Sequence, residues 1–227
     1  GRVREVSDGR SLSVTLRYDA LQRVSGWTAT ELRGGHTLAV DITPDAYGRE
    51  VTRTLTHSNG EVRTQTQTWY AGGQLKTRTL SRSLNHGQAE TLRAETFSYD
   101  ARGRLKTYGV TGSQLPRDAH GNAFVRQCFT FDALSNIRTC ETTLDGAGHG
   151  AVITATFGYA DHDPCRLRSV TYDSTQYGHR NLAFSDTDYD AAGRLLKDEA
   201  GRRLHYDACG RLVRVEAPGG QAVAGYG

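Results

Sequence analysis

Short runs of threonine, β-branched and aromatic residues recur along this chain, and they are typical of β-strands. Runs of this kind without proline cover residues 52–56, 62–70 and 152–157. No apolar stripe with helical spacing extends over about ten residues. Residues 87–95 are the one place where a helix could be considered, but this run is short and continues directly into residues 96–99. The pattern therefore predicts an all-β chain in which 87–95 is also strand.

A five-residue string, Asp-Ala-x-x followed by Arg or Asn, recurs seven times along the chain. Such self-similarity is the mark of a repeat architecture. An aromatic residue precedes the Asp in five of the strings, and Gly is often the fourth residue. A degenerate string lies at Tyr70–Leu75, and each of the two longest intervals between strings is long enough to contain a degenerate copy. The seven strings, with the aromatic residue where there is one, are Tyr18 with Asp19–Arg23, Asp45–Arg49, Tyr99 with Asp100–Arg104, Asp118–Asn122, Phe131 with Asp132–Asn136, Tyr189 with Asp190–Arg194, and Tyr206 with Asp207–Arg211; their fourth-position glycines are Gly48, Gly103, Gly121, Gly193 and Gly210.

Each string suits a hairpin turn. The Asp carboxylate can accept backbone N–H groups within a type I turn, and Gly adopts the positive φ that follows. If Asp100 to Gly103 form the turn, Tyr99 and Arg104 become cross-strand neighbours, and an Arg over a tyrosine ring adds about 0.5 to 1 kcal/mol. The same reasoning pairs Tyr18 with Arg23, Tyr189 with Arg194 and Tyr206 with Arg211. We therefore predict about eight consecutive antiparallel hairpins.

Composition and charge exclude several classes of protein. The 28 basic and 25 acidic residues give a net charge of only +3, too balanced for a disordered or strongly polyanion-binding chain. No apolar run is long enough to span a membrane, and the first residues do not form a signal peptide. The chain lacks methionine, as expected for a piece of a longer protein. The composition predicts a soluble, ordered segment that does not bind nucleic acid.

The cysteines and histidines are the residues that could form a site. His162 with Cys165 and His205 with Cys209 have ligand-like local spacings, but they fit no standard zinc motif, so we expect structural roles and no metal. A hairpin centred on Leu134 would bring Cys128 opposite Cys140. A disulfide is then conceivable, although a reducing cytosol would keep both thiols and a bulge would displace the pairing. Alkylation of the two thiols would decide between these alternatives.

The sequence offers no set of catalytic groups. It contains no Gly-x-Ser-x-Gly string and no Walker or dinucleotide-binding loop, and turns account for its many glycines and aspartates. We therefore predict no enzyme activity and no cofactor. Trp27 and Trp69 could stack on sugar rings, but packing between strands is the simpler interpretation.

The Tyr-Asp-x-x-Gly-Arg-Leu core of Tyr99–Leu105, Tyr189–Leu195 and Tyr206–Leu212 resembles the Rhs or YD-repeat family. The resemblance covers essentially the whole chain, so residues 1–227 are expected to be an incomplete piece of one repeat domain. It implies that the hairpins form part of a large spiralling β-sheet, which closes as a hollow shell around a toxic C-terminal domain.

A narrower resemblance links three further segments to the C components of Tc insecticidal toxin complexes. These segments are Phe129–Ile137, Asp163–Val170 and Asp198–Arg202, in that order. The self-cleaving region of that family carries an Asp-Pro-x-Gly-Leu motif, whereas here Asp163-Pro164 is followed by Cys165-Arg166. We therefore carry over neither protease activity nor catalytic aspartates.

The resemblance implies a non-enzymatic wall segment of a shell that encapsulates a toxic effector for delivery. The implied partners are the shell repeats before and after this segment, the enclosed toxin domain, and a delivery component of a toxin complex or secretion apparatus. The implied location is secreted, after synthesis in a bacterial cytoplasm. The alternative is an extracellular YD-repeat module that binds carbohydrate or a cell surface, for which binding lost on Trp69→Ala would be evidence.

Overall fold

Nearly all regular structure in this protein is β-strand. The computed structural model describes residues 1–85, 87–118, 121–146, 150–174 and 178–226. In that part of the chain the helical content is a single 3₁₀ turn, η1 (Asp186–Asp188), and no helix is long and apolar enough to cross a bilayer. The strands are β1 (Glu5–Ser7), β2 (Leu12–Tyr18), β3 (Val24–Glu31), β4 (Thr37–Pro44), β5 (Glu50–His57), β6 (Glu61–Trp69), β7 (Leu75–Leu84), β8 (Glu90–Tyr99), β9 (Leu105–Thr111), β10 (Phe124–Phe131), β11 (Ile137–Leu144), β12 (Val152–Tyr159), β13 (Leu167–Ser174), β14 (Gly178–Ala183), β15 (Arg203–Tyr206), β16 (Leu212–Glu216) and β17 (Ala222–Gly225).

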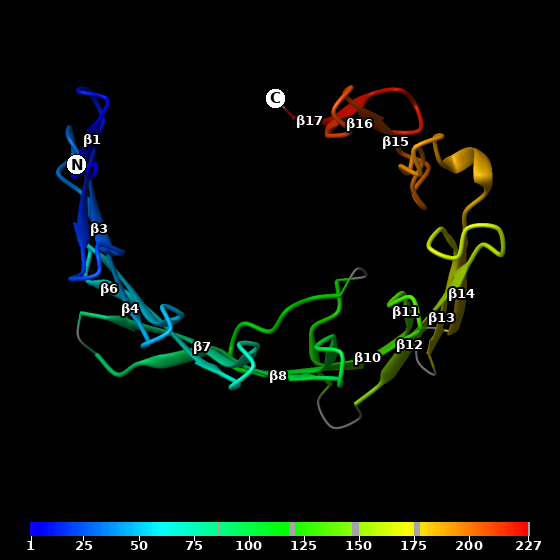
Figure 1. Ribbon diagram of the computed structural model, residues 1–227, viewed down its shortest axis with the longest axis horizontal. Helices are drawn as coiled ribbons and strands as arrows, with labels where there is room; N and C mark the ends of the chain where they lie inside the picture. The colour runs from blue at the N-terminus through cyan, green and yellow to red at the C-terminus, as the bar shows by residue number, and fades with distance from the viewer. Residues whose placement is uncertain (86, 119–120, 147–149, 175–177, 227) are drawn as a thin grey trace. The chain divides into compact units, whose positions relative to one another are not determined.

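The strands pair in the order in which they follow one another along the chain. Strands β1 to β14 form one sheet in sequence order, and β15 to β17 form a second sheet (Figure 1). The pairings between consecutive strands are antiparallel. This confirms the predicted all-β fold of consecutive hairpins. Of residues 87–95, predicted as strand, Glu90–Glu95 are strand in β8, whereas residues 87–89 precede it and are not. The chain forms two compact units, Gly1–Gln127 and Cys128–Gly227.

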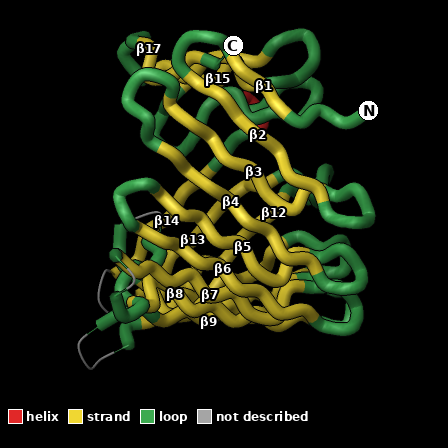
Figure 2. Tube along the Cα trace, turned by 90° about the vertical axis from the view of Figure 1, so that its left-hand side faces the viewer, coloured by secondary structure: helices red, strands yellow, loops and turns green. Residues whose placement is uncertain are grey.

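The long sides of the first unit differ from each other. Consecutive antiparallel strands lie side by side from β1 to β9 (Figure 2), so alternate connections must lie at opposite strand ends. The connections β2–β3, β4–β5, β6–β7 and β8–β9 share one side, which we call the motif rim because recurring turns lie there. The connections β1–β2, β3–β4, β5–β6 and β7–β8 share the other side, which we call the loop rim.

The two faces of the first unit also differ. Residues paired across strands point to the same face, and one face carries rows of small hydroxyl and alanine side chains. We call it the hydroxyl face. One row runs through Thr43, Thr52, Thr66, Thr79, Ala94 and Thr111 on β4 to β9, and another through Thr15, Thr28, Ala39 and Thr56 on β2 to β5. This arrangement explains why threonine-rich runs form strands here, since β-branched side chains pack well on a pleated surface.

The opposite face, which we call the mixed face, holds the large apolar side chains together with long charged ones. Its central row runs through Leu16, Trp27, Val40, Leu55, Arg63 and Arg82 on β2 to β7. Val40 is only 1% exposed. In the second unit the corresponding cluster is Ala155, Val170 and Phe184, with Tyr189 and Leu195 packed against it. The core of each unit is therefore a layer of side chains on one face of a sheet.

Candidate functional site

The recurring feature of this protein is a hairpin turn of fixed hydrogen-bond pattern. At Asp100 the backbone N–H donates to the Arg104 carbonyl at 2.9 Å, and the Gly103 N–H donates to the Asp100 carbonyl at 2.9 Å. Gly103 has a φ of +78°, which L-residues with a side chain rarely adopt. The strings at Asp19, Asp45, Asp118, Asp132, Asp190 and Asp207 have the same two bonds. The fourth residue is Gln22 or Ser135 in two of them, and both also have positive φ.

The aspartate of the turn holds the residue that closes it. Asp100 Oδ1 accepts the backbone N–H groups of Arg102 and Arg104 at 2.9 and 3.0 Å, and Oδ2 accepts Arg104 Nε at 2.7 Å. The pairs Asp19–Arg23, Asp45–Arg49, Asp190–Arg194 and Asp207–Arg211 have ion pairs of 2.6 to 2.7 Å. At Asp118 and Asp132 the amide of Asn122 or Asn136 donates instead. The Asp thus fixes both the backbone and the closing side chain of each of these turns.

These contacts also make the turn sensitive to acid. The Arg104 backbone N–H and guanidinium lower the pKa of Asp100, against a smaller opposing effect of burial. We expect Asp100→Asn to lower the Tm at neutral pH. A lowered pKa stabilises the fold above the unfolded-state pKa of about 3.9, and this stabilisation is lost as pH falls through the folded-state pKa.

Thermal melts of the wild type and Asp100→Asn between pH 7 and pH 2 measure this effect. The control is Glu199→Gln, which removes a negative charge from an exposed position. The gap between the wild type and Asp100→Asn should close in acid, and the control should show no such convergence. A gap that stayed constant down to pH 2 would contradict the role of the carboxylate charge.

The predicted tyrosine–arginine neighbours are wrong. Tyr99 pairs with Leu105, and Tyr18, Tyr189 and Tyr206 likewise pair with Val24, Leu195 and Leu212. The reason is that the positive-φ residue adds one position to the turn, so that Asp and Arg close the loop and face each other. The register then shifts by one between the residue before Tyr and Tyr itself, for example between Ser98 and Tyr99.

The aromatic residue instead connects its turn to an earlier turn. In four turns its polar tip donates a hydrogen bond to the carbonyl of the residue that follows the Arg or Asn of an earlier turn, and Tyr18 makes the corresponding bond to Val3, which follows Arg2 ahead of β1. The bonds are Tyr18 Oη to Val3 at 2.5 Å, Trp69 Nε1 to Glu50 at 2.9 Å, Tyr159 Oη to Ile137 at 2.8 Å, Tyr189 Oη to Leu167 at 2.8 Å, and Tyr206 Oη to Leu195 at 2.9 Å. We call these bonds the cross-turn bonds.

Arginine stacks on the same rings. The guanidinium carbon of Arg194 lies 5.1 Å from the centre of the Tyr206 ring, and that of Arg49 lies 5.7 Å from the Trp69 ring. Arg2 over Tyr18 and Arg166 over Tyr189 repeat the arrangement. The cation–π contact expected within one hairpin is therefore made between consecutive turns. Each such pair links two hairpins in addition to the bonds between their strands.

Three further turns have the same backbone pattern without the full string. Tyr70 takes the place of the Asp in the turn that Gln74 closes, which makes Trp69 the aromatic residue of that turn. Asp198 and Arg202 form a complete turn with a 2.6 Å ion pair, and a string defined by Gly and Arg rather than by Asp-Ala would have found it. The third is Ala217–Gln221, where the Ala217 N–H donates to the Gln221 carbonyl at 2.8 Å and the Gly220 N–H donates to the Ala217 carbonyl at 2.9 Å. Ala160–Arg166, in one of the two long intervals of the sequence, closes a longer loop with a different bonding pattern.

The cysteines and histidines do not form a site in the described structure. All four cysteines are free thiols. The Thr130 and Thr139 hydroxyls lie 2.6 Å apart, so the register places Glu141, not Cys140, opposite Cys128. Burial raises the pKa of the Cys140 thiol. His162 and His205 lie 3.6 and 3.0 Å from the carboxylates of Asp186 and Glu216, and the described residues contain no group of three or more potential metal ligands.

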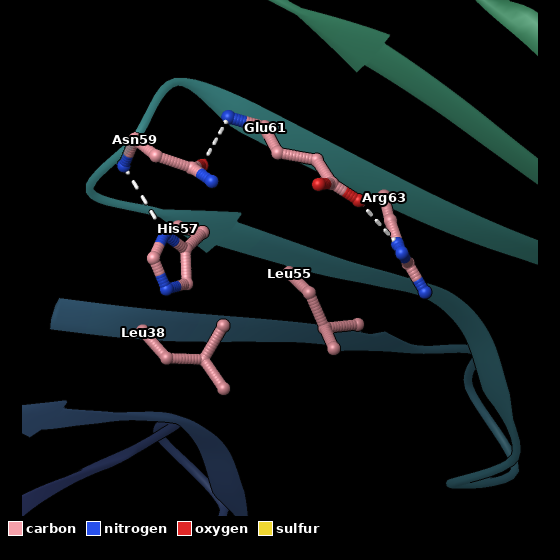
Figure 3. A pocket seen from close by; sticks show the side chains of 6 residues that line it. All are labelled: Leu38, Leu55, His57, Asn59, Glu61 and Arg63. Atoms are coloured by element: carbon pink, nitrogen blue, oxygen red, sulfur yellow. Dashed lines mark hydrogen bonds and ion pairs between the residues drawn. The ribbon is translucent and has the colours of Figure 1, made fainter.

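A hollow of about 320 Å³ lies at the loop rim of the mixed face. Figure 3 shows the six side chains that line it, Leu38, Leu55, His57, Asn59, Glu61 and Arg63. The Asn59 backbone N–H donates to His57 Nδ1 at 3.1 Å, and the Glu61 N–H donates to Asn59 Oδ1 at 2.9 Å. Arg63 Nε donates to Glu61 Oε1 at 2.6 Å. The hollow therefore has an apolar floor of two leucines and a polar border held by its own hydrogen bonds.

Comparisons with known proteins support the fold. No family model matches this chain, and no curated protein matches it in sequence. The structure of TcdB2-TccC3 matches with a TM-score of 0.63 at 14% identity, over 90% of this chain and 11% of that chain. TcdB2-TccC3-Cdc42 matches with a TM-score of 0.62, and a Photorhabdus luminescens Tc holotoxin pore with a substituted TccC3 matches with 0.61, at the same identity and coverage. This chain thus has a fold found in Tc toxin structures and spans about a tenth of their length.

Proposed function

We propose that this chain is a non-enzymatic wall segment of an Rhs-type β-shell that encapsulates a toxic effector domain for delivery. The cross-turn bonds are the observation that carries this proposal. They join neighbouring hairpins within each unit, at the strand ends where the recurring turns lie, so the hairpins of a unit are linked by side chains as well as by strand pairing. A wall needs such links because each hairpin is supported mainly by its immediate neighbours.

The fold shared with Tc toxin structures supports the same proposal. By analogy, the partners are shell repeats on either side of this segment, the enclosed toxin domain and a delivery component of a toxin complex. The protein is made in a bacterial cytoplasm and secreted. The fully paired order of β1 to β14 supports this role, since an unpaired strand edge within a wall would bind other chains.

Substitution of Trp69 distinguishes the proposed structural role from a carbohydrate-binding function. Its indole N–H already donates to the Glu50 carbonyl, and Arg49 lies over its ring. We expect Trp69→Phe to cost about 1 kcal/mol of unfolding free energy, the usual contribution of one hydrogen bond, without a change in glycan binding. Urea unfolding and a glycan array measure the two quantities. Loss of glycan binding with unchanged stability would favour a sugar-binding surface instead.

Electron microscopy of the protein that carries this segment tests encapsulation. We expect a closed particle with density inside it, and the internal density should disappear when the enclosed domain is deleted. An open or solid particle that exposes its sheet to solvent would contradict the proposal.

A further inference from the structure

The β5–β6 turn at the loop rim shares a backbone bond with the recurring turns but differs from them in sequence. Its Gly60 N–H donates to the His57 carbonyl at 3.0 Å, and Gly60 has a φ of +86°. His57 stands where the motif turns have Asp, and its Nδ1 accepts the backbone N–H two residues on, as the carboxylate of Asp100 does. The residue before the turn glycine is Asn59, and no motif turn has asparagine at that position.

An asparagine followed by glycine is chemically labile. The backbone nitrogen of the next residue can attack the side-chain carbonyl carbon, and glycine has no side chain that would obstruct this approach. Of the five asparagines in the chain, Asn59 is the one that precedes glycine. Residues with side chains follow the other four, Asn85, Asn122, Asn136 and Asn181. Asn59 is therefore the asparagine whose amide is most open to attack by its own backbone.

The hydrogen bonds of the turn prepare the Asn59 side chain for this attack. Its Oδ1 accepts the Glu61 backbone N–H at 2.9 Å, and Figure 3 shows the side chain turned toward that group. Negative charge develops on Oδ1 when Cγ is attacked, and a positioned N–H donor stabilises such charge. Asn59 is exposed, and its Nδ2 has no hydrogen-bond partner in the described part of the chain. The nitrogen that must leave is therefore in contact with water.

One bond of the turn opposes the reaction. The Gly60 nitrogen must lose the proton that it donates to the His57 carbonyl before it attacks. The turn lies beyond the last paired residues of the two strands, Thr56 and Val62. Exposed turns of this kind open locally at a small fraction of the free energy of unfolding. The attack can therefore proceed from brief openings of this one bond, with the sheet still paired.

Asp8-Gly9, which precedes β2, shows what the structure adds to the sequence pattern. Both residues are exposed, and Gly9 also has a positive φ of +70°. Oδ1 of Asp8 accepts three backbone N–H groups, those of Arg10, Ser11 and Leu12, at 2.8, 2.8 and 3.0 Å. The Leu12 N–H and the Ser11 hydroxyl contribute most to lowering the pKa of Asp8. Its carboxylate is therefore ionised at neutral pH, and an ionised carboxylate resists attack by a backbone nitrogen.

We propose that Asn59 is a modification site of this protein, at which the side chain deamidates without an enzyme. The Gly60 nitrogen loses its proton and bonds to Asn59 Cγ, the bond from Cγ to Nδ2 breaks, and Nδ2 leaves as ammonia. Water then opens the cyclic imide at either carbonyl and yields aspartate or isoaspartate. Both products add a negative charge beside Glu61 at the border of the hollow, and isoaspartate also adds one backbone atom to the turn. The reaction needs water and no partner, so it stands or falls separately from encapsulation.

Peptide mapping by mass spectrometry tests the site in the protein that carries this segment. The folded protein is aged at mildly alkaline pH, and circular dichroism before and after ageing checks that it stays folded. We expect the Asn59 peptide to convert progressively to aspartate and isoaspartate, faster as pH rises, because the Gly60 nitrogen attacks only after it loses its proton. Asn136, which Ile137 follows, and Asp8 are the internal controls and should stay unmodified over the same period.

Asn59→Gln is the matched variant. It keeps an amide at this position, but the longer side chain would have to form a larger ring, so conversion at residue 59 should be lost completely. A second sample unfolded in urea gives the rate without the turn. An Asn59 that converts in urea and stays intact in the folded protein would overturn the proposal, since the turn would then protect the amide. Conversion of Asn136 or Asp8 as fast as that of Asn59 would overturn it as well.

Discussion

Replacing Gly112 with alanine will destabilise the fold by about 4 kcal/mol. Gly112 follows β9 with a φ of +125°, and a Cβ built there would lie 2.4 Å from the Leu92 carbonyl oxygen and 2.9 Å from Arg93 Cα. Both contacts are with the β8 backbone, which cannot turn away as a flexible side chain can. The substitution therefore combines a strained backbone conformation with a direct clash between two chain segments.

Gly73→Ala is the matched control for this prediction. Gly73 also has a positive φ, +87°, but a Cβ there meets nothing within 4 Å. It should cost about 1 kcal/mol, the penalty of the backbone conformation alone. Urea unfolding of the two variants and the wild type gives both values. An equal decrease in unfolding free energy at the two positions would show that the close approach of Gly112 to β8 does not add to the cost of the substitution.

Local turn chemistry explains why the fold could be predicted from sequence. Asp and Gly with a following Arg specify a hairpin within five residues, and such strings recur, so the order of the strands follows from the order of the strings. The threonine-rich runs between the strings favour strand over helix, so the sequence predicted strands as the regular structure. The degenerate string at Tyr70 was found because its glycines remain, and Asp198–Arg202 was missed because Glu199 stands where the other strings have Ala.

Register could not be predicted, and much of the site depends on it. The positive-φ residue of each turn shifts the strand pairing by one position. Tyr99 therefore pairs with Leu105 and not with the predicted Arg104, and Cys128 does not lie opposite Cys140. The cross-turn bonds join residues of different hairpins, such as Tyr206 and Leu195, which no string within one hairpin contains. The hollow depends on neighbouring strands in the same way, because Leu38, Leu55 and Glu61 come from three of them.

Glu95 is the buried charged residue among the described residues of the first unit, and its removal is the second substitution for which we expect a large effect. Its side chain is only 3% exposed. Arg78 Nε and Nη2 donate to its two oxygens at 2.5 and 2.9 Å, and Tyr108 Oη donates at 2.7 Å. Burial raises the pKa of Glu95, but the hydrogen bonds from Arg78 and Tyr108 and the Arg78 charge outweigh it and lower that pKa overall. Burial and the bond to Glu95 raise the pKa of Tyr108.

We expect Glu95→Ala to lower the unfolding free energy by about 3 kcal/mol at pH 7. The substitution removes the acceptor of three hydrogen bonds and leaves Arg78 beside an apolar gap. The loss stays at the lower end of the range for buried pairs because the Arg78 side chain is 37% exposed and can regain water. Glu95→Gln keeps the shape and removes only the charge, so it should destabilise less than alanine does.

Glu90→Gln on the same strand provides the matched control. Glu90 pairs with Arg82 at 3.0 Å, but the two side chains are 45% and 44% exposed, and exposed ion pairs contribute little. Its substitution should leave urea unfolding at pH 7 nearly unchanged. The pKa of Glu90 is lowered as well, by the Ser113 hydroxyl and by Arg82, so the size of the stability gap, and not the direction of its pH dependence, separates the two carboxylates. A lowered pKa stabilises the fold above the unfolded-state glutamate pKa of about 4.3, and this stabilisation is lost as pH falls through the folded-state pKa. The gap between wild type and Glu95→Gln should therefore be full at pH 7 and close in acid. A gap of equal size for Glu90→Gln, or one that persists below pH 2, would show that the Arg78–Glu95–Tyr108 cluster does not stabilise the sheet through its charge.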